Sequence, residues 1–502
     1  MDLFTHPDLL SVIREYTRIQ NVYDTCATLS TIKQHFRYNL NKTYSMMYCN
    51  DISFKNRLLN RILNPNKQLY LDLNNTTARN GRLLGNVHTL DLRNCQGLTD
   101  VSALGNVHTL NLRDCRRITD VSALGNVHTL DLTFCNMTDV SALGNVHTLH
   151  LQDCENITDV SALGNVHTLN LRGTNITDAS ALGNVHTLNL GLCNITDVSM
   201  LGNVHTLDLL ECEQITDFSA LGNVHTLNLR GCNITDASAL GNVHTLNLSF
   251  CNITDVSALG TIHTLYLHNC ENITDVSALG NVHTLNLSYS NIRDVSMLGK
   301  VHTLDLHNCQ YIMDVSALGN VHTLNLSRCN MTDVSMLGKV HTLDLHYCEY
   351  IEDVSALGNV HTLNLSLCGE LTDVSALGNV HTLNLSYCGE IRDVSMLGNV
   401  HTLYLTWTYI TDVSALGNVH TLKLAKCKHI TDVSALGNVH TLDLSECKIT
   451  DVSALGNVHS LKLAKCKYIK DVSALRNVYI IDYTSCNTTE VSVLGKRKYS
   501  DS

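Results

Sequence analysis

An α/β solenoid built from short stacked coils is the fold that this 502-residue sequence predicts. The phrase LGNVHTL recurs along most of the chain, and its histidine steps by 19 or 20 residues from His88 to His459. Each copy also repeats one apolar pattern. A repeat of about this length indicates a solenoid, because one coil is too small to bury its own apolar side chains and stacked neighbours share a core.

The elements of one coil can be followed in the copy at residues 107–125. Leu110 and Leu112 alternate with polar residues, and this period of two predicts a short strand with one buried face. Cys115 and Ile118 are then expected to point inward as the chain leaves the strand.

A tight segment on the opposite side of the coil is predicted from the phrase TDVSAL. Thr119 or Asp120 can cap a short helical or 3-10 turn, and Ala123 and Leu124 are expected to pack inward. Gly125 stands where a residue in the left-handed region would end that turn before the next strand begins.

The full pattern, L-x-x-L-x-L-x-x-C-x-x-I-T-D-V-S-A-L, resembles the leucine-rich-repeat family over residues 67–494. Its second half is similar to internalin-type repeats, and its cysteine is similar to the repeats of F-box/leucine-rich-repeat proteins. The near-identical copies also resemble leucine-rich-repeat proteins of giant DNA viruses. The resemblance implies an arc of about 21 or 22 coils, with a parallel sheet on the concave face and short helical or 3-10 segments on the convex side.

Residues 1–66 differ from the repeats in composition. Residues 1–80 hold ten Lys and Arg against six Asp and Glu, whereas the whole chain has a net charge of -12. Between residues 6 and 39 apolar side chains recur at helical spacing. This stretch resembles an F-box, which implies helices that dock a Skp1-like protein through Pro7, Leu9, Leu10, Ile13, Tyr16 and Phe36. His6 and Thr17 depart from the F-box pattern, and the alternative is a helical cap over the open end of the solenoid.

Charge and composition argue against several classes of protein. A net charge of -12 disfavours general binding to nucleic acid or to an anionic membrane. No apolar run approaches the roughly 18 residues of a transmembrane helix, and the first residues lack the pattern of a signal peptide. Eighteen cysteines share one position of the coil, which indicates a reducing compartment. We therefore expect a cytoplasmic monomer, with a disordered basic tail at residues 495–502.

Three polar positions recur in nearly every coil. The cysteines are expected to be free buried thiols, because their Cβ atoms lie at the strand spacing and no CxxC pattern suggests zinc. The aspartate of TDV is expected to cap the short turn, with a calcium row as the alternative. The histidines could form a metal-binding row or a titrating row, or they could result from duplication alone. We expect mutual repulsion to lower their pKa and to make the protein less stable in mild acid; no metal site is predicted.

Information specific to this chain is expected where the copies differ, at the positions that follow each strand leucine. One group there combines exposed aromatic or apolar side chains with a basic block, a combination that is typical of binding sites for acidic or phosphorylated partners. The alternative is sequence drift on a solvated face of the sheet. The candidate partner-binding residues are Tyr347, Leu367, Tyr387, Tyr404, Trp407, Lys423, Lys426, Lys462 and Lys465.

No catalytic motif is visible in the sequence, and neither an enzyme nor a cofactor is expected. The leading hypothesis is a substrate-recruiting adaptor of a cullin ubiquitin ligase. In it the F-box-like helices would dock a Skp1-like protein, and the concave face would hold the substrate. The resemblance to viral proteins extends the expected location to the cytoplasm of an infected host. The alternative is a leucine-rich-repeat binding scaffold without linkage to a ubiquitin ligase.

Overall fold

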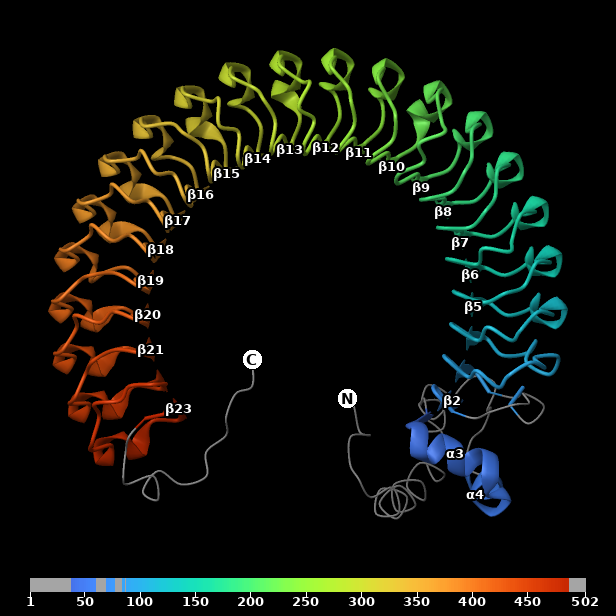
Figure 1. Ribbon diagram of the computed structural model, residues 1–502, viewed down its shortest axis with the longest axis horizontal. Coiled ribbons are helices and arrows are strands. Elements are labelled where there is room, and N and C mark those ends of the chain that lie inside the picture. Colours follow the sequence, from blue (N-terminus) through green and yellow to red (C-terminus); the bar gives the residue numbers. More distant parts are fainter. Residues whose placement is uncertain (1–37, 60–68, 77–83, 86, 487–502) are drawn as a thin grey trace, which may run out of the picture. The chain divides into compact units, whose positions relative to one another are not determined.

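The computed structural model describes residues 38–59, 69–76, 84–85 and 87–486. In this part of the chain the predicted solenoid is confirmed, because short parallel strands alternate with 3-10 segments from residue 122 onward. The chain divides into two compact units, Met1–Ile234 and Thr235–Ser502, and each is described by itself. In each unit the strands line the inner side of the coils and the 3-10 segments lie on the outer side (Figure 1).

The first unit contains two described α-helices and ten described strands. Successive strands from β2 onward pair in parallel, and equivalent residues face each other, as Leu110 faces Leu130. The 3-10 segments begin at a serine and end two or four residues later, from η1 (Ser122–Leu124) to η6 (Ser219–Asn223). The other elements are β1 (Tyr38–Leu40), α3 (Lys42–Asn50), α4 (Ile52–Leu59), β2 (Leu69–Asp72), β3 (Thr89–Asp91), β4 (Thr109–Asn111), β5 (Thr129–Asp131), β6 (Thr148–His150), β7 (Thr168–Asn170), β8 (Thr187–Asn189), β9 (Thr206–Asp208) and β10 (Thr226–Asn228).

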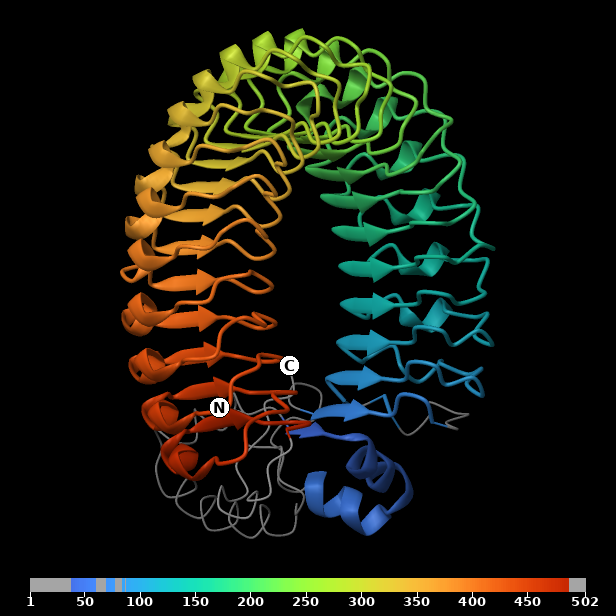
Figure 2. The same cartoon turned by 60° about the vertical axis from the view of Figure 1, so that its left-hand side comes forward.

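The second unit repeats the same coil, and its strands lie side by side in parallel (Figure 2). Its 3-10 segments run from η7 (Ser238–Leu240) to η19 (Ser473–Asn477). The strands are β11 (Thr245–Asn247), β12 (Thr264–Tyr266), β13 (Thr284–Asn286), β14 (Thr303–Asp305), β15 (Thr323–Asn325), β16 (Thr342–Asp344), β17 (Thr362–Asn364), β18 (Thr382–Asn384), β19 (Thr402–Tyr404), β20 (Thr421–Lys423), β21 (Thr441–Asp443), β22 (Ser460–Lys462) and β23 (Ile480–Asp482).

The core of each unit is a stack of identical apolar layers. In a representative coil the inward residues are no more than 2% exposed, and they are Leu110, Leu112, Cys115, Ile118, Val121 and Leu124. Full burial of one leucine side chain contributes about 2 kcal/mol. Because each layer is covered only by the coils before and after it, a coil is stable through its neighbours.

The outer turn begins as the sequence predicts and ends differently. The N-cap residue is Val121, which makes no side-chain cap bond, but Asp120 just before it accepts a hydrogen bond from the first amide of the turn, that of Ser122, at 3.0 Å. The left-handed residue predicted at Gly125 is wrong, because Gly125 has φ −62°. Glycine is needed there for close packing, since a Cβ atom on Gly125 would overlap the carbonyl oxygen of Ala142 in the next coil.

The left-handed residue lies instead at the exit of each strand. Twenty non-glycine residues of the described chain have φ between 53° and 64°, and all occupy this position. At Lys426 the turn is closed by a hydrogen bond from the amide of Cys427 to the carbonyl of Leu424, at 3.1 Å. A positive φ at the third residue is the signature of a type II turn. The amide of Lys426 also donates to the carbonyl of Ser445 in the next coil, which helps to offset the strain.

The alternation between 19 and 20 residues arises in the turn after the cysteine. Coils of 20 residues place two residues between the cysteine and the next buried apolar side chain, and coils of 19 place one. In several shorter coils that single residue is an asparagine, such as Asn136 or Asn175. Asn136 Nδ2 donates to the carbonyl of Arg116 in the previous coil at 2.9 Å, so the shorter turn is tied to its neighbour.

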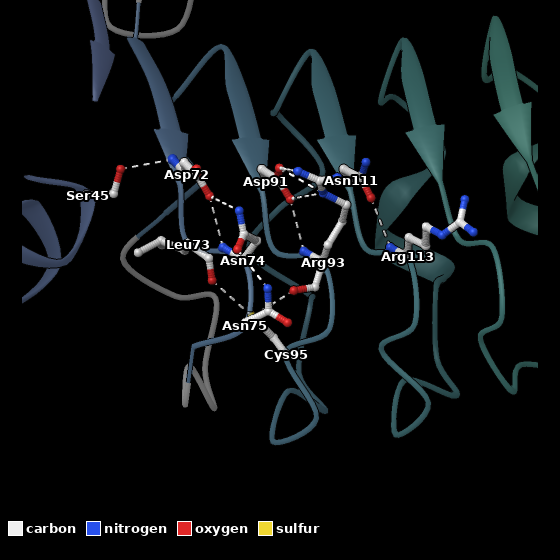
Figure 3. Close-up of polar contacts among 10 residues, drawn as sticks. All are labelled: Ser45, Asp72, Leu73, Asn74, Asn75, Asp91, Arg93, Cys95, Asn111 and Arg113. Atoms are coloured by element: carbon white, nitrogen blue, oxygen red, sulfur yellow. Dashed lines mark hydrogen bonds and ion pairs between the residues drawn. The ribbon is translucent and has the colours of Figure 1, made fainter. Parts of the chain in front are cut away.

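The segment before the repeats extends the sheet. Helices α3 and α4 lie within residues 1–66 but after the stretch of helical spacing at residues 6–39, and the same segment contains strand β1, which pairs with β2 in parallel. Buried Ser45 of α3 donates to the carbonyl of Leu40 and accepts from the amide of Asp72. Figure 3 shows this junction and the first coils, where side-chain oxygens of Asp72, Asp91 and Asn111 each accept the backbone amide two residues later.

We predict that Gly378→Ala destabilises the protein by about 1–3 kcal/mol, because the new Cβ would overlap the carbonyl oxygen of Met396 and force the coils apart. Gly369→Ala in the same coil is the control, since a Cβ there meets no atom within 4 Å. Urea unfolding of the full chain measures both. Equal midpoints for the two variants would show that close packing does not select glycine in this turn.

Candidate functional site

Two rows of side chains cross strands β19 to β22 on the solvent-facing side of the strands. The first row consists of the third residue of each strand, and the strand pairings place these residues directly beside one another. The second consists of the left-handed turn residues that follow the same strands. Both rows read aromatic, lysine, acid, lysine. The paired rows are Tyr404, Lys423, Asp443 and Lys462, and Trp407, Lys426, Glu446 and Lys465.

The aromatic end of the paired rows is held together by ring contacts. The rings of Tyr387 and Trp407 meet edge to face, with centroids 5.6 Å apart. The Nζ atom of Lys423 lies 4.9 Å from the Tyr404 ring centroid, and that of Lys426 lies 5.8 Å from the centroid of Trp407. Such cation–π contacts hold the lysines over the rings and leave their charge available to a partner.

The acidic residues of the paired rows are only partly engaged with the lysines. Lys465 Nζ lies 3.2 Å from Glu446 Oε1, and this hydrogen bond and charge lower the pKa of Glu446. Asp443 instead accepts hydrogen bonds from the amide and hydroxyl of Ser445 in its own coil. Within the described residues no carboxylate lies within ion-pair distance of Lys423 or Lys462. The first row therefore presents two lysines without an acidic partner.

The structure brings together part of the predicted site. The side chains of Tyr387 and Trp407 are 42% and 50% exposed, so the aromatic end of the paired rows reaches solvent. Tyr347 is also exposed, but its ring packs under the guanidinium of Arg328, 5.1 Å from the ring centroid, and no described ring contact joins it to Tyr387. Leu367 is half-buried and occupies the left-handed turn position of the coil between those of Tyr347 and Tyr387. One group is formed by the predicted residues Tyr404 and Trp407 and the predicted lysines. Tyr347 and Leu367 occupy the left-handed turn position of earlier coils.

Sequence reasoning missed the two carboxylates of the paired rows. Asp443 and Glu446 each stand between two lysines of the neighbouring coils, so the segment resembles a uniform basic block. The alternation of sign is visible when the copies are aligned on the histidine phrase, because the two rows stand three and six residues after His401, His420, His440 and His459. The site therefore carries a charge pattern and not a uniform basic patch.

A second polar arrangement on the strands of the same unit was also missed. Histidines at positions 268, 307 and 346 alternate with serines one coil later, a super-repeat of two coils. His307 Nδ1 lies 2.7 Å from Ser327 Oγ, and Ser327 Oγ donates to Asn325 Oδ1. The serine hydroxyls are buried, so this network is a rigid part of the sheet face and not a reactive serine site.

Comparison with known proteins identifies the coil. The sequence model of the family described as Leucine Rich repeat matches residues 223–241, 242–260 and 438–456. Among solved structures, the TLR13–ssRNA13 complex has a TM-score of 0.52 at 20% sequence identity, and the match covers 78% of this chain and 65% of that one. Three coils thus match the leucine-rich-repeat family model, and the chain has the fold of leucine-rich-repeat solenoids.

Two further structures are similar to this leucine-rich-repeat chain at lower TM-scores. An internalin (inlF) from Listeria monocytogenes matches with TM-score 0.33 and 20% identity, over 66% of this chain and 84% of that one. The functional domain of InlJ from Listeria monocytogenes, whose description includes a cysteine ladder, matches with TM-score 0.39 and 21% identity, over 72% and 74%. No curated protein matches the chain at a significant level.

The cysteines of these leucine-rich repeats form an inner row of free thiols. All nineteen cysteines among the described residues are free, which confirms the prediction. Cys115 Sγ donates to the carbonyl of Leu92 in the previous coil at 3.1 Å, and burial raises the pKa of this thiol to about 12. Thr174 replaces cysteine with a hydroxyl that bonds the carbonyl of Leu171 in its own coil. The position therefore holds a buried hydrogen-bonding group in most coils, although the buried hydroxyl of Ser290 has no partner among the described residues, and burial makes the thiols unreactive.

The histidines of the repeats form a stacked row in each unit. Neighbouring ring centroids lie 4.5–4.7 Å apart and the rings are nearly parallel, from His88 to His225 and from His244 to His459. From His88 to His440 each ring Nδ1 also lies near the hydroxyl of the following threonine, at 3.2 Å for His283 and Thr284. The described residues hold no group of three or more His, Cys, Asp or Glu side chains arranged for a metal ion.

The pKa of several row histidines is lowered, in the direction that the sequence predicts. The group comprises His186, His283, His322, His381 and His420. The main cause is desolvation, because stacked neighbours cover both faces of each ring while its edge stays exposed. Repulsion from the flanking imidazoles adds to it. The predicted cause, repulsion alone, is thus the smaller contribution.

The remaining predicted residues and segments lie outside the structural description. The F-box-like residues Pro7, Leu9, Leu10, Ile13, Tyr16 and Phe36 precede residue 38, and the tail at residues 495–502 follows residue 486. None of the described helices is long and apolar enough to cross a bilayer.

We predict that the protein loses thermal stability as the pH falls from about 7.5 to 5.5, either side of the ordinary histidine pKa. A histidine whose pKa is lower in the folded chain binds protons more readily in the unfolded chain. Its stabilising contribution is therefore full above the unfolded pKa and is lost as the pH falls. Melting temperatures across this range test the prediction. A variant with His283→Gln and His322→Gln should show a smaller loss, and a pH-independent melting temperature would refute the account.

Proposed function

We propose that this chain is a protein-binding scaffold and that its partner contacts the face that carries Tyr387, Tyr404 and Trp407. Solenoids of this kind present extended surfaces on their inner side. The observation that carries the proposal is the cluster of half-exposed aromatic rings with lysines above them, on a face whose other strand positions are mostly asparagine and aspartate.

Strain and exposure at the turn residues support this role. Trp407 adopts φ 60° and is 50% exposed. A bulky side chain in this conformation contributes little to the stability of the fold, because it is held away from the core and its backbone has an unfavourable φ. Aromatic residues in such positions are typical of binding hot spots.

Site-specific photocrosslinking tests the scaffold proposal. We expect a crosslinking amino acid at position 407 to capture a discrete partner in cells, and the same residue at Tyr468 to capture none. Tyr468 is a matched control, because it is 55% exposed but lies in the turn after the cysteine of its coil, away from the paired rows. Tyr387→Ala should reduce the yield at position 407. Equal crosslinking at both positions would contradict a localised site.

We also propose the more specific role of a substrate-recruiting adaptor of a cullin ubiquitin ligase, acting in the cytoplasm, including that of an infected host. Its support is the resemblance of residues 6–39 to an F-box, followed by leucine-rich repeats. In this role a Skp1-like protein would bind the N-terminal segment and the paired rows would hold the substrate. A leucine-rich-repeat scaffold without linkage to a ligase is the alternative.

Co-purification with a Skp1-like protein separates these two roles. The adaptor role predicts that the full chain retains Skp1 and that Leu9→Ala combined with Leu10→Ala lowers retention about tenfold, by removing two apolar side chains from the interface. Trp407→Ala is the control and should retain Skp1 fully. Absence of Skp1 from the unaltered chain would leave the scaffold role and remove the adaptor role.

A further inference from the structure

We propose that the paired rows bind an acidic peptide segment in the polyproline II conformation, with a carboxylate at every third residue. This inference rests on the proposed role in binding a protein partner and names the chemistry of that partner. It is carried by three observations: the alternation of charge in the paired rows, the spacing of their lysines and the confinement of basic residues to the last coils.

The spacing of the lysines selects the conformation of the peptide. Lys423 and Lys462 occupy equivalent positions on β20 and β22, with Asp443 of β21 in register between them. Two strand spacings are about 9.6 Å. A polyproline II helix has three residues per turn and rises about 3.1 Å per residue, so side chains i and i+3 share a face about 9.3 Å apart. In a β-strand the residues that share a face are about 6.8 or 13.6 Å apart.

The second row repeats the same requirement. Lys426 and Lys465 are also two coils apart and flank Glu446, so the two rows present the same order of charges to one ligand. Asp443 and Glu446 lie opposite the residues between the two carboxylates of the peptide. Those intervening residues must be uncharged or basic, because a carboxylate there would meet a like charge.

The basic character is confined to this part of the second unit. In the segments from each strand to the turn after its cysteine, the coils of β20 to β23 carry seven lysines and three carboxylates. The same segments of β11 to β18 carry one arginine and six carboxylates. A surface that changes sign within a few coils is complementary to a short acidic segment rather than to a uniformly charged partner.

The aromatic end of the rows supplies the second element of recognition. Tyr404 lies directly beside Lys423 on the neighbouring strand, and the ring of Trp407 contacts the ring of Tyr387. Exposed aromatic rings are the surfaces on which proline-rich segments dock, since the preformed helix loses little conformational entropy on binding. A proline one or two residues from the first carboxylate would therefore reach these rings.

A nucleic acid fits the paired rows less well. Its phosphates form an unbroken line of negative charge, which would pass directly over Asp443 and Glu446. Alternating lysines and carboxylates suit a ligand whose charges are separated by neutral residues, and the acidic net charge of the whole chain, -12, also disfavours a polyanion.

Trp407 is the single tryptophan of the chain, so its fluorescence reports on this site directly. The full chain would be titrated with a peptide that lacks tryptophan and tyrosine and carries glutamate at every third position among prolines. The comparison ligands are the same peptide with glutamine for glutamate, a glycine-rich peptide with glutamate at every second position, and a single-stranded oligonucleotide of equal charge. We expect the proline peptide to bind at least about fivefold more tightly than each of the others, since only it matches both the lysine spacing and the aromatic rings.

Charge-reversed variants locate the binding. The double variant Lys423→Glu with Lys462→Glu should lower the affinity for the proline peptide about tenfold. The control is Lys470→Glu, which lies beyond the buried isoleucine of its coil and should change the affinity by no more than about twofold. Melting temperatures establish that the variants fold. Equal affinity for the two glutamate spacings, or tighter binding of the oligonucleotide, would overturn the inference.

The outcomes also separate this inference from the proposed function. Capture of a protein by crosslinking at position 407, without binding or competition by the proline peptide, would preserve the scaffold role and reject the acidic polyproline ligand. Failure of both crosslinking and peptide binding would reject the two together.

Discussion

In-register pairing between neighbouring coils, over the buried leucine of each strand and the buried leucine that follows it, is the constraint on which the rest of the structure depends. It makes every coil adopt the same path, so that Leu110 lies beside Leu130 and each cysteine reaches the carbonyl of the coil before it. Because the leucines face inward, the residue between them lies on the opposite side of the strand, where it is half-buried or exposed in most coils. Equivalent residues of successive coils therefore form straight rows, and a substitution in one copy changes one site in a row without disturbing its register.

These rows explain how a nearly monotonous sequence can hold a specific surface. The stacked histidines and the buried thiols are rows in which the copies agree, and both have a structural role. The paired rows are places where the copies differ, in the order aromatic, lysine, acid, lysine, twice over. The left-handed turn contributes as well, because a positive φ at Trp407 holds its side chain outward, where a partner could contact it.

The coil could be predicted from the sequence almost completely, because burial of Leu110 and Leu112 and capping by Asp120 depend on local pattern. The role of Gly125 could not, since it is required by the carbonyl of the neighbouring coil and not by its own backbone. The left-handed turn was hidden for a related reason. Asparagine or glycine usually marks such a turn, and some coils have them, as at Asn94 and Gly173, but other coils place tyrosine, tryptophan or lysine there. The lysines and aromatic residues of the site were found, but Asp443 and Glu446 were missed, although they follow His440 at the same offsets as the lysines follow His420 and His459.

In this account the residues at which the copies differ determine recognition, and the coil is a passive support for them. Moving the paired rows to β13–β16, whose coils have the same lengths, tests it directly in a chain where Lys423 and Lys462 are alanine. The substitutions are Asn286→Tyr, Tyr289→Trp, Asp305→Lys, Asn308→Lys, Asn325→Asp, Arg328→Glu, Asp344→Lys and Tyr347→Lys. The account predicts that affinity for the acidic proline peptide returns to within about threefold of the unaltered chain. A folded variant that still fails to bind would contradict it.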